Sequence, residues 1–295
     1  MTGSNLLTRI VFDPKDERAY ALVRIVFGCI AFLNICDLWD YRETLFSAAG
    51  IVPINLDGNR YHLSLFYFLQ SSEAVTSYFL FSGMMALLLT FGIIPRVAAI
   101  CVFVWQVSYS AQLGFVTYGA DSAMRVYAFL IMVSPLGACW TIRNVLTKSP
   151  SPPAQVPGYG IVLMRIQLAV IYIDTTIVKL ASEHWRNGEA FTYYMLSVYS
   201  RWKSPLFADW AWLSTACTYG ALLLEFLLPI LLFVRRTRMV AMFLGISLHL
   251  MIAVTSSNLL MFSLAMIPGY LSFLDGRELS QAADRFRFFR RTRLS

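Results

Sequence analysis

The sequence predicts an all-α, polytopic membrane protein, a bundle of about eight transmembrane helices whose N and C termini are cytoplasmic. Of its 295 residues, 58% are hydrophobic and 14% are charged, whereas soluble domains carry about a quarter charged residues. Eight apolar stretches are long enough to cross a bilayer, and Lys and Arg concentrate on one side of them. The net charge of +7 therefore indicates contact with anionic lipid rather than with nucleic acid.

The eight stretches are separated by residues that end helices. Gly92 and Pro95 divide the second from the third, and a proline-rich linker at 149–158 divides the chain into two halves of four. We expect one domain over residues 1–295, with a basic cytoplasmic tail at 275–295. The expected spans lie near 19–38, 74–94, 97–117, 122–140, 159–181, 211–234, 239–256 and 258–274.

The distribution of basic residues predicts the orientation. With the N-terminus in the cytoplasm, the inner segments hold 15 Lys and Arg and the outer loops hold 5. The N-terminal 18 residues mix acidic with basic side chains and have no cleavage site, so the first span is expected to act as its own insertion signal. The expected location is the cell membrane, which in a bacterium is the inner membrane.

Two outer loops, 39–73 and 182–210, are rich in aromatic residues, which favour the headgroup region. Within the second loop, the segment WRNGEAFTYYML, which begins at Trp185, predicts a short amphipathic helix. This helix is expected to lie on the membrane or to cap a cavity in it.

Ionisable side chains inside the spans are the first candidates for function, because a charge at the bilayer centre costs about 2.5–3.5 kcal/mol. The predicted topology places one group of them in the outer half of the membrane and leaves Arg24 and Arg165 deeper. It therefore predicts a single polar cavity that opens outward. The outer group consists of Asp121, Arg125, Asp174, Lys179 and His249.

Lys179 is the candidate for chemistry. Arg165, Tyr172 and Lys179 are seven residues apart and therefore lie on one helix face. A lysine at the end of such a polar stripe, partly withdrawn from water, could act as a base. The alternative is that Lys179 extends its ammonium along the helix into water.

Each of the other embedded groups has a structural and a functional interpretation. Asp174 is either an interhelical partner of Arg125 or a catalytic carboxylate, and Glu225 is either paired or functional. His249 is either a packing residue or a ligand-binding one. No metal site is expected, since the cysteines have no ligand spacing and His249 is the one embedded histidine, which also excludes haem ligation across the bilayer.

Several segments together resemble the HTTM domain, the membrane half of vitamin K-dependent gamma-carboxylases and of their bacterial relatives. The segments that carry the resemblance run through residues 18–275. They include ALVRIVFGCIAFLNICDLWDYRETLFSAAGIVP, TYGADSAMRVYAFLIMVSPLGACW, RIQLAVIYIDTTIVKLASEHWRNGEAFTYYM, LLLEFLLPILLFVRRTR and HLMIAVTSSNLLMFSLAMIPGYLSFL.

The resemblance implies a site for reduced vitamin K and a lysine that acts in its oxygen chemistry, which maps onto Lys179 before Leu180. This chain differs from the carboxylases in two ways, which limit how far their activity can be expected here. The carboxylases have a further functional histidine where this chain reads LGACW at 136–140, and they continue into a large β-rich domain after the membrane helices. The HTTM domain also occurs alone in bacteria, in a protein for maturation of a secreted toxin peptide.

Two functions are therefore expected from different classes. The first is a carboxylase-like or oxidoreductase-like enzyme that uses a lipid quinone or quinol, with Lys179 as the base and His249 as a second catalytic residue. Arg125, with His249, would position a quinone oxygen, Tyr172 and Trp185 would help to position the quinone, and the aromatic outer loop would form a lid. The second is a non-catalytic accessory for maturation or export of a secreted peptide or protein. Transport is less favoured, because no internal repeat is evident. The structural polar partners are Arg24, Asp121, Arg165, Asp174 and Glu225.

Overall fold

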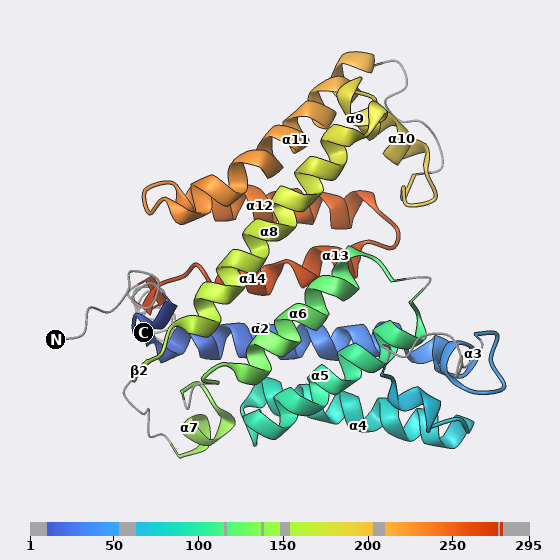
Figure 1. The fold of residues 1–295 in the computed structure, drawn as a ribbon, viewed down its shortest axis with the longest axis vertical. Helices are drawn as coiled ribbons and strands as arrows, with labels where there is room; N and C mark the ends of the chain where they lie inside the picture. The colour runs from blue at the N-terminus through green and yellow to red at the C-terminus, as the bar shows by residue number, and fades with distance from the viewer. Residues whose placement is uncertain are drawn as a thin grey trace, which may run out of the picture. The chain divides into compact units, whose positions relative to one another are not determined.

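In the residues that it describes, the computed structural model is all-α apart from a two-residue ladder and an isolated bridge between Ser200 and Ser256 (Figure 1). It describes residues 11–52, 63–114, 117–136, 139–147, 154–202, 210–276 and 278–279. The chain forms two compact units. Unit 1 consists of Met1–Leu163 with Leu274–Ser295, and unit 2 is Met164–Phe273. The expectation of a single domain stays a prediction.

Five described helices are long and apolar enough to cross a membrane. They are α2 (Glu17–Asp37), α4 (Ser72–Phe91), α8 (Tyr159–Ala181), α11 (Ala211–Phe233) and α12 (Arg238–Thr255). The chain is therefore a multi-pass membrane protein, as expected. The count of eight spans and the cytoplasmic termini stay predictions, and most of the basic tail lies outside the described residues.

Helices also lie at the other three expected spans, but their ends differ from those predicted. They are α5 (Pro95–Gln112), α6 (Gly119–Val133) and the pair α13 (Leu260–Ala265) and α14 (Ile267–Leu271). Helix α6 ends early because Pro135 favours an extended backbone at Ser134. The last expected span is broken at Met266, where Pro268 in the first turn of α14 has no N–H to continue the helix.

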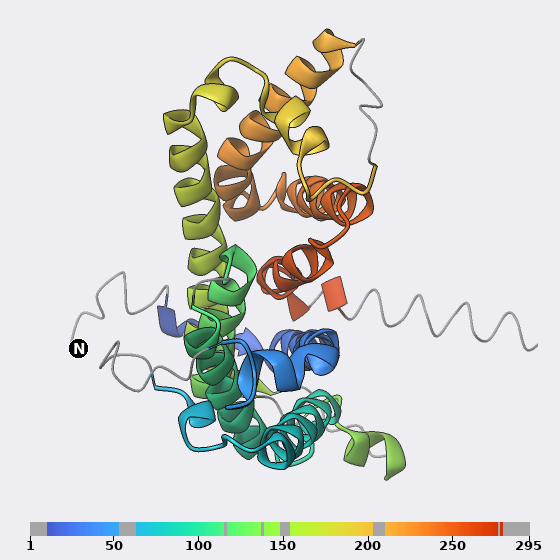
Figure 2. The ribbon, with the colours of Figure 1, turned by 90° about the vertical axis from the view of Figure 1, so that its right-hand side faces the viewer.

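In unit 1, helices α2, α4, α5 and α6 pack side by side (Figures 1 and 2). At one end, α3 (Arg42–Phe46) adds Phe46 to the core and the 3₁₀ turn η2 (Leu65–Tyr67) adds Phe66, while the 3₁₀ turn η1 (Trp39–Tyr41) has no buried residue. Phe46, Phe66, Phe79 and Trp105 are fully buried, with ring centroids of Phe79 and Trp105 4.8 Å apart. Burial of such large rings accounts for much of the stability of this end.

Arg24 is buried in the middle of unit 1. Its Nη2 donates to the carbonyl of Trp140 at 2.8 Å and to that of Cys139 at 3.4 Å, and its Nη1 donates to the carbonyl of Leu136 at 3.5 Å. Gly92 ends α4 with a φ of 68°, and a Cβ there would lie 2.7 Å from Nη1. The guanidinium therefore joins α2 to the segment that connects α6 to α7 (Ile142–Leu146).

The described end of the proline-rich linker, 154–158, also belongs to unit 1. Strand β2 (Gln155–Val156) pairs antiparallel with β1 (Lys15–Asp16), with Lys15 opposite Val156. The hydroxyl of Tyr20 donates to the carbonyl of Pro157 at 2.7 Å. The linker thus adds a short ladder to the start of α2, and residues 149–153 lie outside the described part.

The start of α2 predicts a pH dependence of stability. Asp16 is the N-cap of α2, and hydrogen bonds from the Arg18 side chain lower the pKa of the Asp16 carboxyl below its ordinary value of 3.8. A lowered folded-state pKa gives stability that is present above the unfolded pKa and is lost as pH falls through the folded one. We expect Asp16→Ala to cost about 1 kcal/mol at pH 7.

Thermal unfolding in detergent at pH 7 and at pH 3 would measure this, with Asp16→Asn as the matched variant. Asparagine keeps a cap oxygen but has no titrating group. It should therefore lie closer to the wild type at pH 3 than at pH 7. An Asp16→Ala protein as stable as the wild type at pH 7 would contradict the prediction.

Unit 2 contains most of α8, followed by α9 (Glu183–Arg186), α10 (Ala190–Leu196), α11 and α12. Helices α11 and α12 pack together, and α13 runs back along α12 (Figure 1). The amphipathic helix expected at 185–196 is instead two short helices. Gly188, with a φ of 77°, turns the chain between them.

Candidate functional site

The polar stripe of α8 is directed at other helices of unit 2. Arg165 Nε donates to the carbonyl of Ser272 at 2.8 Å. One heptad on, the Tyr172 hydroxyl is 2.8 Å from His249 Nε2 on α12. After a further heptad, Lys179 forms an ion pair with Glu225 on α11. All three side chains are therefore occupied by polar contacts within unit 2.

The Lys179–Glu225 pair is largely withdrawn from solvent. The side chains are 21% and 10% exposed, and the Lys179 ammonium bonds to Glu225 Oε2. The same oxygen is 3.4 Å from the Thr175 hydroxyl, one turn before Lys179 on α8. On its other side, the ammonium lies 4.6 Å from the centroid of the Trp185 ring. A carboxylate and an aromatic face together stabilise the cation.

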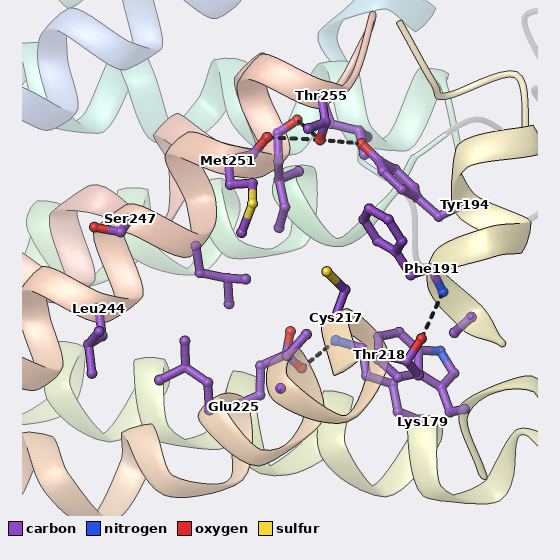
Figure 3. Close-up of a pocket in the computed structure, with 18 of the residues that line it drawn as sticks. Lys179, Phe191, Tyr194, Cys217, Thr218, Glu225, Leu244, Ser247, Met251 and Thr255 are labelled. Atoms are coloured by element: carbon purple, nitrogen blue, oxygen red, sulfur yellow. Dashed lines mark hydrogen bonds and ion pairs between the residues drawn. The ribbon is translucent and has the colours of Figure 1, made fainter. Parts of the chain in front are cut away.

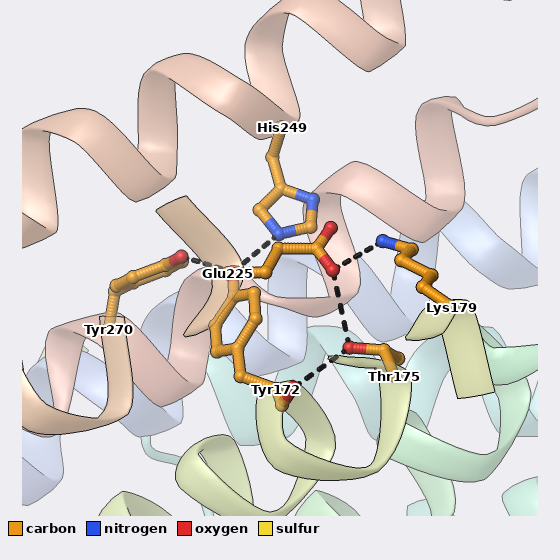
Figure 4. Close-up of polar contacts among 6 residues, drawn as sticks. All are labelled: Tyr172, Thr175, Lys179, Glu225, His249 and Tyr270. Carbon is orange, nitrogen blue, oxygen red and sulfur yellow. Dashed lines mark hydrogen bonds and ion pairs between the residues drawn. The ribbon is translucent and has the colours of Figure 1, made fainter. Parts of the chain in front are cut away.

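A second polar cluster lies beside this pair (Figure 4). His249 is 5% exposed, and its Nε2 bonds to the Tyr172 hydroxyl, which in turn bonds to the hydroxyl of Tyr270 on α14. His249 Nδ1 is buried and has no hydrogen-bond partner among the described residues. Helix α8 and the two later helices α12 and α14 thus contribute to one buried cluster.

The Lys179–Glu225 pair forms part of the wall of a cavity of about 510 Å³ within unit 2 (Figure 3). This volume is in the range of small-molecule sites. The floor and sides come from α11 and α12, and α10 closes one end. The apolar lining includes Trp185, Phe191, Leu224, Leu244, Leu248, Met251, Ile252, Leu259 and Phe262.

Polar contacts hold α10 at the end of the cavity. The backbone N–H of Phe191 donates to the Thr218 hydroxyl at 3.0 Å, and the Tyr194 hydroxyl is 2.8 Å from that of Thr255. Phe191 and Tyr194 therefore turn toward the cavity (Figure 3). The arrangement provides an apolar chamber with one ion pair in its wall, suited to an apolar molecule that carries a polar group.

The sequence matches the HTTM domain family over residues 12–275, nearly the whole chain. The chain belongs to the HTTM family. This confirms the family expected from its sequence segments.

Two Bacillus subtilis proteins are similar to this HTTM chain. Uncharacterized protein YitO is 29% identical over 106 residues, which is 34% of this chain and 33% of YitO. Sporulation-delaying protein SdpB is 27% identical over 187 residues, which is 60% of this chain and 55% of SdpB. The matches thus span a third and about half of those relatives. No solved structure is significantly similar.

The remaining predicted site residues of the HTTM chain lie elsewhere. Asp121 and Arg125 belong to unit 1, where the Tyr109 hydroxyl donates to Asp121 Oδ1 at 2.6 Å and Arg125 is half-buried on α6. Asp174 is exposed on α8 and has no hydrogen bond or ion pair with the described residues of unit 2. Its pairing with Arg125, and a role for Arg125 in positioning a ligand, stay predictions.

Three features of the HTTM site were not predicted. Thr175 could have been found, because it lies one turn before Lys179 on the same helix face. The pairing of Glu225 with Lys179 and the contribution of Tyr270 carry no sequence signal, since both depend on how separate helices pack. Among the described residues, no group of His, Cys, Asp and Glu side chains could hold a metal ion.

Proposed function

We propose that this HTTM protein is a membrane enzyme that binds a lipid quinol in the cavity of unit 2 and removes a proton from it with Lys179. The observation that supports this is the Lys179–Glu225 ion pair in the wall of an otherwise apolar cavity. The apolar lining fits a ring and the start of a prenyl chain, and the ion pair meets the polar edge of the ring. Trp185 lies beside the ammonium.

The proton transfer proceeds in two balanced steps. In the first step, the Lys179 ammonium gives a proton to the Glu225 carboxylate, which leaves a neutral amine beside a neutral carboxylic acid. The amine then accepts the proton of a quinol hydroxyl, which leaves a quinolate next to the new ammonium. A positioned general base of this kind contributes about 10²–10⁴-fold to a rate.

The protein is proposed to have the topology that its basic residues predict. With the N-terminus in the cytoplasm and eight spans, Lys179 lies in the outer half of the membrane and the cavity serves the outer face. Carboxylation of a docked protein is not part of the proposal, because the chain has no histidine in the segment at 136–140.

Cavity filling tests the binding. Ala221 lines the cavity on α11, whereas Ala216 is exposed on the same helix. We expect Ala221→Phe to lower the amount of naphthohydroquinone bound at fixed concentration by about 10-fold, since overfilling a site costs about 1–3 kcal/mol. Ala216→Phe should leave binding unchanged. The measurement is native mass spectrometry of the protein purified in detergent, under anaerobic conditions.

The role of Lys179 as the base is tested with naphthohydroquinone bound. The wild type should give the absorption spectrum of the quinolate anion, and Lys179→Met should bind the same compound and leave it protonated. Equal binding by Ala221→Phe and Ala216→Phe would contradict binding of the quinol in the cavity. A quinolate spectrum in Lys179→Met would contradict the role of Lys179 as the base.

A second candidate function is non-enzymatic. In it, the cavity holds an apolar lipid or peptide segment, and the protein assists maturation or export of a secreted partner. The similarity to sporulation-delaying protein SdpB over 60% of the chain favours it. Lys179→Met separates the two, because an accessory role that depends on the apolar lining would survive the substitution and a proton-transfer role would not.

A further inference from the structure

The cavity of unit 2 has an enclosed part and an open rim. Among the described residues that line it, three are exposed: Gly220 on α11, and Leu244 and Met251 on α12 (Figure 3). The two α12 residues are 38% and 55% exposed, whereas the Glu225 side chain in the cavity wall is 10% exposed. The ion pair therefore lies in the enclosed part, and the rim belongs to α11 and α12.

The rim residues lie on the helix faces that line the cavity. Gly220 follows Cys217 by three residues and precedes Leu224 by four, so these three lining residues share one face of α11. Leu244 and Met251 are seven residues apart and share a face of α12. All of these positions are near the middle of helices long and apolar enough to cross a membrane. The rim is therefore at the depth of the hydrocarbon chains, so lipid lies outside it.

Gly220 is a glycine that neither the backbone nor the packing of unit 2 requires. Its φ is not positive, unlike that of Gly188. A Cβ at Gly220 would have no side chain and no other segment of the described chain within 4 Å. Gly245 on α12 differs, because a Cβ there would overlap the Tyr270 hydroxyl. Since glycine inside a helix is less stable than alanine, the open space at Gly220 has a cost that packing does not offset.

The rim is also the way out for a long occupant. Helix α10 closes one end of the cavity, with Phe191 and Tyr194 turned toward it (Figure 3). The enclosed part, with a total cavity volume of about 510 Å³, has room for a ring but not for a long hydrocarbon chain as well. A chain attached to a group beside Lys179 therefore extends across the rim into the bilayer.

We infer that Gly220, Leu244 and Met251 form a lateral portal, in which the hydrocarbon chain of the bound lipid passes from the cavity into the membrane. Gly220 is the specificity-determining residue, because a side chain there obstructs the chain and leaves the enclosed part free. The lipid enters from the bilayer, with its polar group beside Lys179 and Glu225. That this group is a quinol ring rests on the proposed function.

Two ligands that differ only in the chain test the portal. They are naphthohydroquinone and its geranylgeranyl derivative, measured by anaerobic native mass spectrometry of the protein in detergent. We expect Gly220→Phe to lower the bound derivative about 10-fold and to leave naphthohydroquinone binding unchanged. Ala216→Phe is the matched control, because Ala216 is exposed on the same helix and does not line the cavity. It should leave the binding of both compounds unchanged.

Alanine at the same glycine tests the open space without a ligand. We expect Gly220→Ala to raise the midpoint of unfolding by SDS, since alanine favours the helix and its Cβ meets no other group. Gly245→Ala should lower that midpoint, because its Cβ overlaps the Tyr270 hydroxyl. A Gly220→Ala protein less stable than the wild type would show that the space is filled, and would overturn the portal.

The binding results separate the portal from the proposed function. Equal loss of both compounds in Gly220→Phe, or loss of neither, would overturn the portal and leave the proposed function standing. A wild type that binds naphthohydroquinone but not the derivative would also overturn the portal, because the cavity would then be closed to a chain. Failure of both compounds to bind the wild type would overturn the proposed function and, with it, this occupant of the portal.

Discussion

Replacing Glu225 with leucine should lower the free energy of unfolding by about 3–5 kcal/mol, because it leaves the Lys179 ammonium buried without its counter-charge. The two side chains are 10% and 21% exposed, so water reaches the remaining charge poorly. The Trp185 ring would offset only part of the loss. The measurement is the midpoint of unfolding by SDS in mixed micelles, with the wild type in parallel.

The double variant Lys179→Met/Glu225→Leu is the decisive comparison. Removing both charges leaves an apolar wall of similar volume, and such replacements are often neutral or stabilising. We expect the double variant to unfold close to the wild type and well above Glu225→Leu. A double variant as unstable as the sum of the two single variants would show that Lys179 and Glu225 act independently. The double variant should still lack quinolate formation, which separates stability from chemistry.

Arg24→Leu should be the most damaging substitution in unit 1, with a loss of about 3–5 kcal/mol. The guanidinium is 0% exposed and donates to three carbonyls in the segment after α6. Leucine would leave those carbonyls without their donor in an apolar interior. Arg24→Lys should recover part of the loss, since an ammonium keeps the charge but not the planar fork of donors.

Arg143→Leu is the control for this prediction, because Arg143 is exposed on α7 in the same unit. It should change the unfolding midpoint little. The same SDS titration applies, and protease cleavage between α6 and α7 reports the segment directly. An Arg24→Leu protein with the wild-type midpoint would contradict a structural role for this arginine.

Much of the fold follows from local sequence. Apolar stretches of about 20 residues predict membrane helices because a helix satisfies its own backbone in lipid. Five of the eight stretches appear as helices that meet this length and apolarity. Pro135 explains the early end of α6, and Pro268 explains the break before α14. Both differences from the expected spans could therefore have been predicted from the local sequence.

The stripe of Arg165, Tyr172 and Lys179 on one face of α8 was likewise accessible from spacing, because the helical period alone places them together. The residues that this face contacts could not be predicted from that spacing. The pairing of Lys179 with Glu225, the place of Tyr270 beside Tyr172 and the room made by Gly245 all depend on the rotation and register of α11, α12 and α14. This rotation and register are set by packing between segments far apart in the chain. The residues of one helix do not determine the angle at which a neighbouring helix packs against it.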